Sequence, residues 1–323
     1  MSRIAILLIA GAAACAGPKK QPDRPILPPD PTQAKLEPTP AAKPAEPVVE
    51  KPPAPMKPAD VALPLGETTV KLLSGGKGAK AKLAFAPAAN AKQHVAVAMD
   101  FHAKQDGKDD ISPTIILDGD AATRPGAAGG GAIDYALAIT AATAKDVTGS
   151  ELPADKLQPA LVSLVGMTMG GTVAANGTSK ELVLHIEKPD GMTGSALQLV
   201  GLAWPALAAF PAEAVGVGAK WEATTQTHLA EKLAVTRVTT YEVTAHKGKA
   251  WTLKQTVVVT GADQDLDGAK ASKIAGSGTG ELVYTDGAIF PAGTVKGETH
   301  FSVLAGDKTV VLSIETAAAI TTK

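Results

Sequence analysis

The chain has 323 residues with a single cysteine, and its 31 basic residues nearly balance its 32 acidic residues. One cysteine excludes an internal disulfide framework and a cysteine-type zinc site, and balanced charge with only 3% aromatic residues argues against a nucleic-acid-binding surface. Hydrophobic residues make up 45% of the chain, which is ordinary for a folded domain with a core of Ala, Val, Leu and Ile.

Residues 1–14 have the pattern of a secretory signal peptide, with Arg3 followed by an apolar stretch and then small residues. The apolar stretch is far shorter than the roughly 20 residues that a membrane-spanning helix needs, so we expect no retained span. The sequence AAAC, Ala12 to Cys15, resembles the lipobox of bacterial lipoproteins. The resemblance implies that the thiol of Cys15 is diacylated, that the mature chain begins there, and that two or three acyl chains hold it stably at a membrane.

Two features bear on this assignment. Lipoboxes usually have Leu where this chain has Ala12, and Ala12 with Ala14 also suits an ordinary signal peptidase, which would release a protein with a free thiol. We expect the anchor, because Cys15 has no partner for a disulfide. Ala16 is not the aspartate that commonly retains enteric lipoproteins in the inner membrane. The resemblance therefore implies the periplasmic leaflet of the outer membrane, with surface display as the alternative.

Residues 15–60 are expected to form a disordered tether. The segment after Cys15 holds fourteen of the 24 prolines and has no helix or strand periodicity. Proline-rich segments favour extended polyproline II conformations. At about 3.1 Å per residue, such a tether reaches at most on the order of 140 Å. We expect a passive spacer rather than a segment that binds the cell wall or a partner.

From Val61 to Lys323 the sequence alternates apolar and polar residues with the period of β-strands that bury one face. Such alternation is typical of antiparallel sheets, because strands of parallel sheets are buried on both faces. We estimate about ten strands, separated by Gly-containing turns. The clearest apolar faces are Val95, Val97, Met99 and Phe101; Ile133, Tyr135, Leu137 and Ile139; Leu182, Leu184 and Ile186; Trp251, Leu253, Val257 and Val259; and Val310, Leu312 and Ile314.

Two segments have helical spacing instead. Residues 153–166 place Leu157, Leu161 and Leu164 on one side, and residues 194–210 do the same with Leu197, Val200 and Trp204. Pro159 and Pro205 should break or kink these helices. The expected fold is mainly β: a strongly curved antiparallel sheet or barrel-like domain with one or two short helices. Two similar Gly/Thr-rich blocks, residues 166–186 and 276–303, leave open whether the domain is a pair of similar halves, about 61–190 and 211–323.

One loop has the first half of a calcium-binding pattern. Asp263, Asp265 and Asp267 alternate before Gly268, so their carboxylates could converge on a hard cation. The twelfth position of the pattern is Ile274 instead of Glu, and the flanking residues resemble strands. A solvated hairpin loop is the favoured interpretation, with Ca²⁺ as the alternative, and no other cofactor is expected.

No enzyme signature is found, so we expect a non-catalytic protein. The six histidines lie far apart in the sequence, mostly on the polar faces of strands, and show no metal-binding spacing. Ser74 and Lys77 match the Ser-x-x-Lys of penicillin-recognising enzymes, but they lie in a Gly-rich turn without a following helix. The alternating glycines from Gly276 to Gly280 fit a bend or a close backbone approach better than a phosphate-binding loop.

The stretch FPAEAVGVGAKW, Phe210 to Trp221, is the most distinctive local pattern. Its Pro211, Val215, Gly218 and Trp221 resemble residues that precede a long hairpin in uncharacterised bacterial lipoproteins with β-rich C-terminal domains. The resemblance covers about Leu199 to Val303. It implies the fold and the envelope location and carries no known activity.

Two functions remain open. In the first, the curved sheet holds an apolar ligand such as a lipid, and the segment with Leu197, Val200 and Trp204 acts as a lid. In the second, a structural lipoprotein docks another envelope protein through its sheet. A carrier predicts an internal cavity with an apolar mouth, whereas a scaffold predicts a filled core and an exposed apolar patch.

Overall fold

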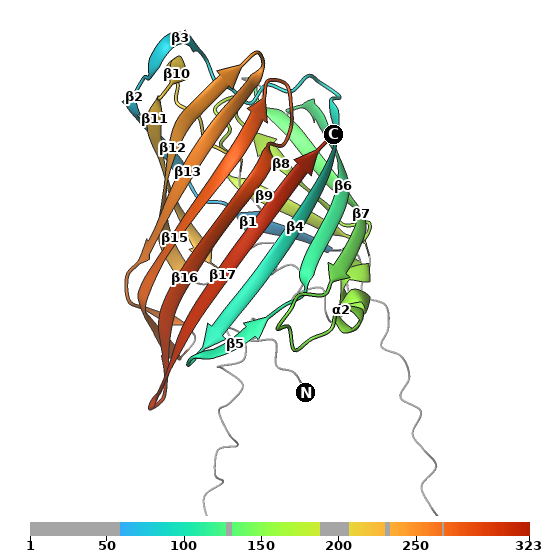
Figure 1. The fold of residues 1–323 in the computed structure, drawn as a ribbon, viewed down its shortest axis with the longest axis vertical. Helices are drawn as coiled ribbons and strands as arrows, with labels where there is room; N and C mark the ends of the chain where they lie inside the picture. Colours follow the sequence, from blue (N-terminus) through green and yellow to red (C-terminus); the bar gives the residue numbers. More distant parts are fainter. Residues whose placement is uncertain (1–58, 127–130, 188–206, 230–232, 267) are drawn as a thin grey trace, which may run out of the picture.

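The structure is a computed structural model, and it describes residues 59–126, 131–187, 207–229, 233–266 and 268–323. Most of these residues form one 15-stranded antiparallel sheet, which confirms the mainly β prediction (Figure 1). The strands are β1 (Ala59–Pro64), β2 (Thr68–Ser74), β4 (Lys92–Gln105), β5 (Lys108–Ile111), β6 (Thr114–Pro125), β7 (Ile133–Lys145), β8 (Thr168–Val173), β9 (Glu181–Ile186), β11 (Lys220–Leu229), β12 (Leu233–Lys247), β13 (Ala250–Gly261), β14 (Gln264–Leu266), β15 (Ala269–Thr285), β16 (Ala292–Ala305) and β17 (Lys308–Thr322).

The remaining described elements are few. Strands β3 (Lys77–Ala81) and β10 (Val215–Val217) form a separate two-stranded sheet, and helix α2 (Ala154–Leu161) continues into the short 3-10 helix η2 (Val162–Leu164). The estimate of about ten strands is too low. Short strands such as β3, β5 and β14 have too few residues to show an alternation. No helix in the described ranges has the length and apolar character needed to cross a membrane.

The order of strands in the large sheet is β1-β9-β8-β7-β6-β4-β17-β16-β15-β13-β12-β11-β2, with β5 and β14 added beside β4 and β15. The two edge strands, β1 and β2, follow each other directly in the chain. Leu65 between them donates its N–H to the carbonyl oxygen of Lys180 at 2.9 Å. The described edge strands do not pair with each other, so the sheet is strongly curved without closing into a barrel.

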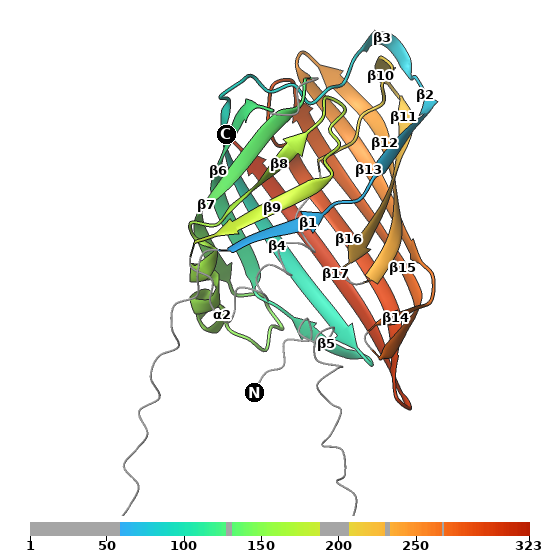
Figure 2. The same ribbon diagram turned by 180° about the vertical axis from the view of Figure 1, so that it is seen from behind.

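The curvature places strands from opposite parts of the sheet across from each other. Strands β1, β8 and β9 pass behind β4, β16 and β17, as both ribbon views show (Figures 1 and 2). We call the face enclosed in this way the inner face. The strands from β4 to β9 and those from β11 to β17 are each contiguous in the sheet, and the two groups meet where β4 pairs with β17.

Alternating glycines allow two neighbouring strands to approach closely. Gly276, Gly278 and Gly280 of β15 lie at alternate positions, opposite Thr299, Gly297 and Val295 of β16. A Cβ at any of the three would lie 2.6–2.8 Å from a carbonyl oxygen of β16. Real Cβ atoms do not approach so closely, so these glycines allow β16 to fold tightly against β15. Of the two expectations, a bend or a close backbone approach, the close approach is confirmed.

The alternation expected from the sequence is also confirmed. On β4, for example, Val95, Val97, Met99 and Phe101 are at most 2% exposed, whereas the intervening Asp100 is exposed. The first expected helix is present as α2 and η2, and its Leu157, Leu161 and Leu164 are buried. In the second segment expected to be helical, Leu197, Val200 and Trp204 lie outside the described residues, and its described end, residues 207–210, is not helical.

Helix α2 is held against β7 by its side chains. Gln158 accepts a hydrogen bond from the N–H of Ala144 at 2.9 Å and donates one to the carbonyl oxygen of Ala142 at 2.8 Å. Asp146 accepts the N–H of Ala154, the first helical residue, at 2.7 Å. Because proline has no N–H to continue the helical ladder, Pro159 favours a short helix, and α2 ends two residues later at Leu161.

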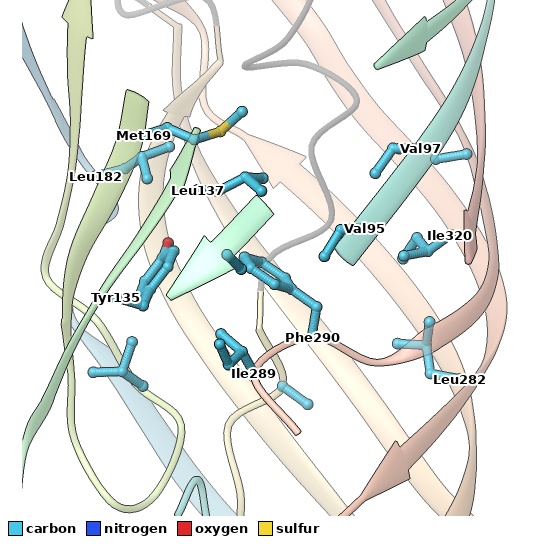
Figure 3. Close-up of a cluster of buried hydrophobic side chains, with 14 of the residues drawn as sticks. Val95, Val97, Tyr135, Leu137, Met169, Leu182, Leu282, Ile289, Phe290 and Ile320 are labelled. Atoms are coloured by element: carbon cyan, nitrogen blue, oxygen red, sulfur yellow. The ribbon is translucent and has the colours of Figure 1, made fainter. Parts of the chain in front are cut away.

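The larger buried cluster is completed by segments that are not strands. Ile289 and Phe290, from the loop between β15 and β16, extend into it, and Phe290 contacts Tyr135 edge-on with ring centroids 5.5 Å apart (Figure 3). Gln93 holds this loop by accepting the N–H groups of Ile289 and Phe290 at 2.9 and 2.7 Å. Leu83, Phe85 and Phe210 also come from loops. The inner face is therefore packed by loops at this part of the sheet.

Candidate ligand-binding face

A second apolar cluster on the inner face is built by strands alone. We call it the lower cluster. Its buried members are Leu233, Val235, Val257, Val259, Ala271, Ile274, Phe301 and Leu312, and its partly buried members are Leu229, Leu266, Val303, Val310 and Ile314. They come from β11 to β17. Among the described residues, no loop or helix contributes to the lower cluster, whereas described loop residues complete the larger cluster.

A band of inner-face residues borders the lower cluster and is polar at its β2 end. Its central row joins Thr68 of β2, Thr225 of β11, Arg237 of β12, Val259 of β13 and Gly276 of β15 through successive register pairs, and Val259 is itself a member of the lower cluster. The row continues through Thr299 of β16 to Ile314 of β17. The Thr68 and Thr225 hydroxyls are 2.7 Å apart and share a hydrogen bond.

Arg237 brings a permanent charge into this band. It shares the inward-facing positions of β12 with buried residues such as Val235 and Thr239, yet it is itself only partly buried. Its positive charge opposes the effect of burial on the pKa of Tyr241, which is nevertheless raised above its usual value. Among the residues that the structure describes, no carboxylate lies within ion-pair distance of Arg237.

Sequence reasoning did not single out Arg237, although a signal was present. In the stretch LAVTRVTTYEV, Arg237 occupies the same alternate positions as Val235, Tyr241 and Val243, which places it on the buried face. What the alternation does not show is whether an acidic residue from another strand neutralises the charge. That depends on the register of the neighbouring strands.

An open hollow of about 750 Å³ lies where β3 and β10 meet the turn between β12 and β13. Ser74, Lys77, Val217 and His246 are among its lining residues. The Ser74 hydroxyl accepts a hydrogen bond from the N–H of Gly76 at 3.4 Å, within the turn that joins β2 to β3. As the sequence predicts, Ser74 and Lys77 lie on either side of a glycine turn with no helix behind them.

His246 is the histidine that departs from the outward-facing pattern. A register shift in β12 before Ala245 turns His246 to the inner face, where its ring stacks on Trp251 with centroids 3.5 Å apart. The indole N–H of Trp251 is buried and has no hydrogen-bond partner.

Three other histidines lie on the outer face between pairs of carboxylates. His94 contacts Asp120 at 3.0 Å and Asp118 at 3.7 Å. His185 contacts Asp60 at 2.6 Å and Glu187 at 3.3 Å. Hydrogen bonds that His185 donates to Asp60 and then to Glu187 raise the pKa of His185.

His102 is the third histidine that lies between two carboxylates on the outer face. It lies 2.9 Å from Asp109 and 3.5 Å from Glu315. Hydrogen bonds from His102 and then Lys104 lower the pKa of Asp109. Because these clusters are exposed on the outer face, they do not belong to the ligand-binding face.

The residues of the calcium pattern are placed as follows. Asp263 lies 3.7 Å from Lys270, and Asp265 of β14 is opposite Lys270 of β15 in the register. Asp267 lies outside the described residues. In the described part of the chain, no three His, Cys, Asp or Glu residues are grouped so that they could hold a metal ion. Cys15 also lies outside the described residues, so its lipidation stays a prediction.

Comparisons with known proteins give no family assignment. No protein-family model matches the chain, and a search of the curated proteins finds no similar sequence.

Proposed function

We propose that the protein is a non-catalytic binding module for an acyl lipid, anchored in the bacterial envelope through Cys15. The observation that carries the binding proposal is the difference between the two clusters of the inner face. Loops complete the larger cluster, whereas the lower cluster consists of strand residues whose outer members are partly exposed. Eight members of the lower cluster are at most 8% exposed, and its accessible apolar surface comes from the partly buried members Leu229, Leu266, Val303, Val310 and Ile314. Such surface is favourable for an apolar ligand, at about 25 cal/mol per Å² buried.

The number of strands supports a ligand within the curve. Side chains alone fill the interior of a sheet that closes with about eight strands, and larger sheets enclose space for a ligand. Here thirteen strands follow one another along the path of the sheet. Side chains of the described loops occupy one part of this interior, and the lower cluster remains as the apolar surface for an acyl chain.

The membrane anchor rests on the sequence. The lipobox resemblance ends at Cys15, and the first described strand begins at Ala59. The proline-rich segment between them would hold the domain at a distance from the membrane, where its inner face could receive a lipid. The periplasmic leaflet of the outer membrane is the proposed location.

Native mass spectrometry with organic extraction tests the proposal. The full chain carries Cys15→Ser, so that no acyl group can be attached covalently, and it is produced in a bacterial periplasm. We expect a stoichiometric additional mass that extracts as lipid. A matched sample with Phe301→Asp, which places a charge in the lower cluster, should lose that mass while retaining its β-sheet circular dichroism.

A clean ligand-free mass for the folded Cys15→Ser chain would contradict the proposal. The scaffolding alternative would then lead, with crosslinking to envelope proteins as the next step. Among the exposed large apolar residues on the outer face, Leu304 of β16 and Val311 of β17 lie diagonally on paired strands, and Val258 lies apart from them on β13. A patch of two exposed side chains is too small to favour docking.

A further inference from the structure

We propose that Arg237 binds the carboxylate of a long-chain fatty acid whose acyl chain lies along the lower cluster. This inference rests on the proposed function, and it adds the charge and chemical class of the ligand. Its basis is a cation on the inner face that lies beside the apolar surface and has no described acidic partner.

The neighbours of Arg237 on the inner face do not neutralise it. Thr225 and Val259 flank it in its own row, and the next row toward the larger cluster contains Thr239, Val257 and Gly278. None of these residues is acidic. Asp110 of β5 lies opposite Ala103 of β4 at the other end of the central row.

A partly buried cation without a partner is unfavourable, because it gives up water without gaining a counter-charge. Arginine presents a planar fork of N–H donors that fits a carboxylate with two parallel hydrogen bonds. The hydroxyl groups of Thr225 and Thr68 lie beside it in the same row and add polar surface for a head group. The position is therefore suited to an anion with two oxygens.

The apolar part of the ligand has a matching surface. From Arg237 along β12, the inward-facing residues are Val235 and then Leu233, both in the lower cluster. The four residue steps from Arg237 to Leu233 cover about 13 Å at about 3.3 Å per residue. Further along the sheet, β16 and β17 continue the surface with the partly buried Val303, Val310 and Ile314. A single acyl chain with its carboxylate at Arg237 would lie along this length.

The test compares lipids that differ only in the head group. Binding of palmitate and 1-hexadecanol to the delipidated full chain carrying Cys15→Ser is measured by isothermal titration calorimetry. We expect palmitate to bind at least tenfold more tightly. Arg237→Gln should weaken palmitate binding by about 10- to 100-fold, the effect of losing hydrogen bonds to a charged group, and should leave hexadecanol binding unchanged.

Two further variants test whether the charge at residue 237 is sufficient and whether removing another arginine has the same effect. Arg237→Lys retains the charge without the planar fork and should retain part of the preference for palmitate. Arg124→Gln removes an exposed arginine of β6 and should change neither affinity. Unchanged hexadecanol binding also shows that Arg237→Gln is folded.

The possible outcomes distinguish this inference from the function on which it rests. If both lipids bind equally and Arg237→Gln has no effect, the role of Arg237 is wrong while the apolar site stands. If neither lipid binds, the proposed function fails as well. If hexadecyl phosphate binds in an Arg237-dependent manner and palmitate does not, the carboxylate assignment is overturned in favour of a phosphate head group.

Discussion

Replacing Trp221 with alanine is expected to lower the free energy of unfolding by about 3–5 kcal/mol, the range for a fully buried large aromatic side chain. Trp221 is 0% exposed and its ring stacks on Tyr241 with centroids 5.4 Å apart. Its indole N–H donates to the carbonyl oxygen of Ala209 at 2.8 Å, which ties the segment after residue 206 to β11. The variant removes packing, stacking and this hydrogen bond together.

Urea unfolding followed by far-ultraviolet circular dichroism measures the effect, and the chain supplies a matched control. Trp251 is equally buried, but its indole N–H has no partner. Trp221→Phe should therefore cost about 1–2 kcal/mol more than Trp251→Phe, because it leaves a buried carbonyl oxygen unpaired. A loss below about 1 kcal/mol for Trp221→Ala would contradict the packing described for β11.

The second large effect is expected at Gly66, in the link between the two edge strands. Gly66 has φ of +80°, and a Cβ there would lie 1.8 Å from the carbonyl oxygen of Gln226. Gly66→Ala therefore combines backbone strain with a collision against the backbone of β11. We expect a loss of about 2–6 kcal/mol and faster hydrogen exchange in β1 and β2, which this link connects.

Gly107 provides the control for Gly66. It also has φ of +80°, but no atom lies within 4 Å of the position of its Cβ. Gly107→Ala should show the strain alone, about 1–2 kcal/mol. Equal losses for the two variants would mean that the link between β1 and β2 does not lie against β11 as described.

The sequence predicts the strand faces well because they depend on local alternation. Val95 to Phe101 and Trp251 to Val259 have their apolar residues at every second position, which only a strand buried on one face explains. The pairing of the strands in the sheet could not be predicted in the same way. The pairing of β1 with β9, for instance Val61 with Leu184, joins residues far apart in the chain, and no local pattern specifies it.

At the candidate site, too, local alternation predicts the face on which a residue lies but not its neighbours on other strands. Alternation along β12 would have placed Arg237 on the buried face, but its lack of a described acidic neighbour depends on the registers of β11 and β13. Similarly, the alternating glycines of β15 indicate a close backbone approach. The strand that they approach becomes evident only when the carbonyl groups of β16 are placed beside them.

Photolabelling is the most direct test of the claim that the inner face binds an acyl chain. The full chain carrying Cys15→Ser is irradiated with palmitate that bears a diazirine near the end of its chain, and adducts are assigned to residues by tandem mass spectrometry. Leu312 and Val311 are adjacent in β17, yet Leu312 belongs to the lower cluster and Val311 is 52% exposed on the outer face. The account predicts adducts at Leu312, Ile314 or Phe301. Adducts confined to Val311 and other outward-facing residues would contradict it.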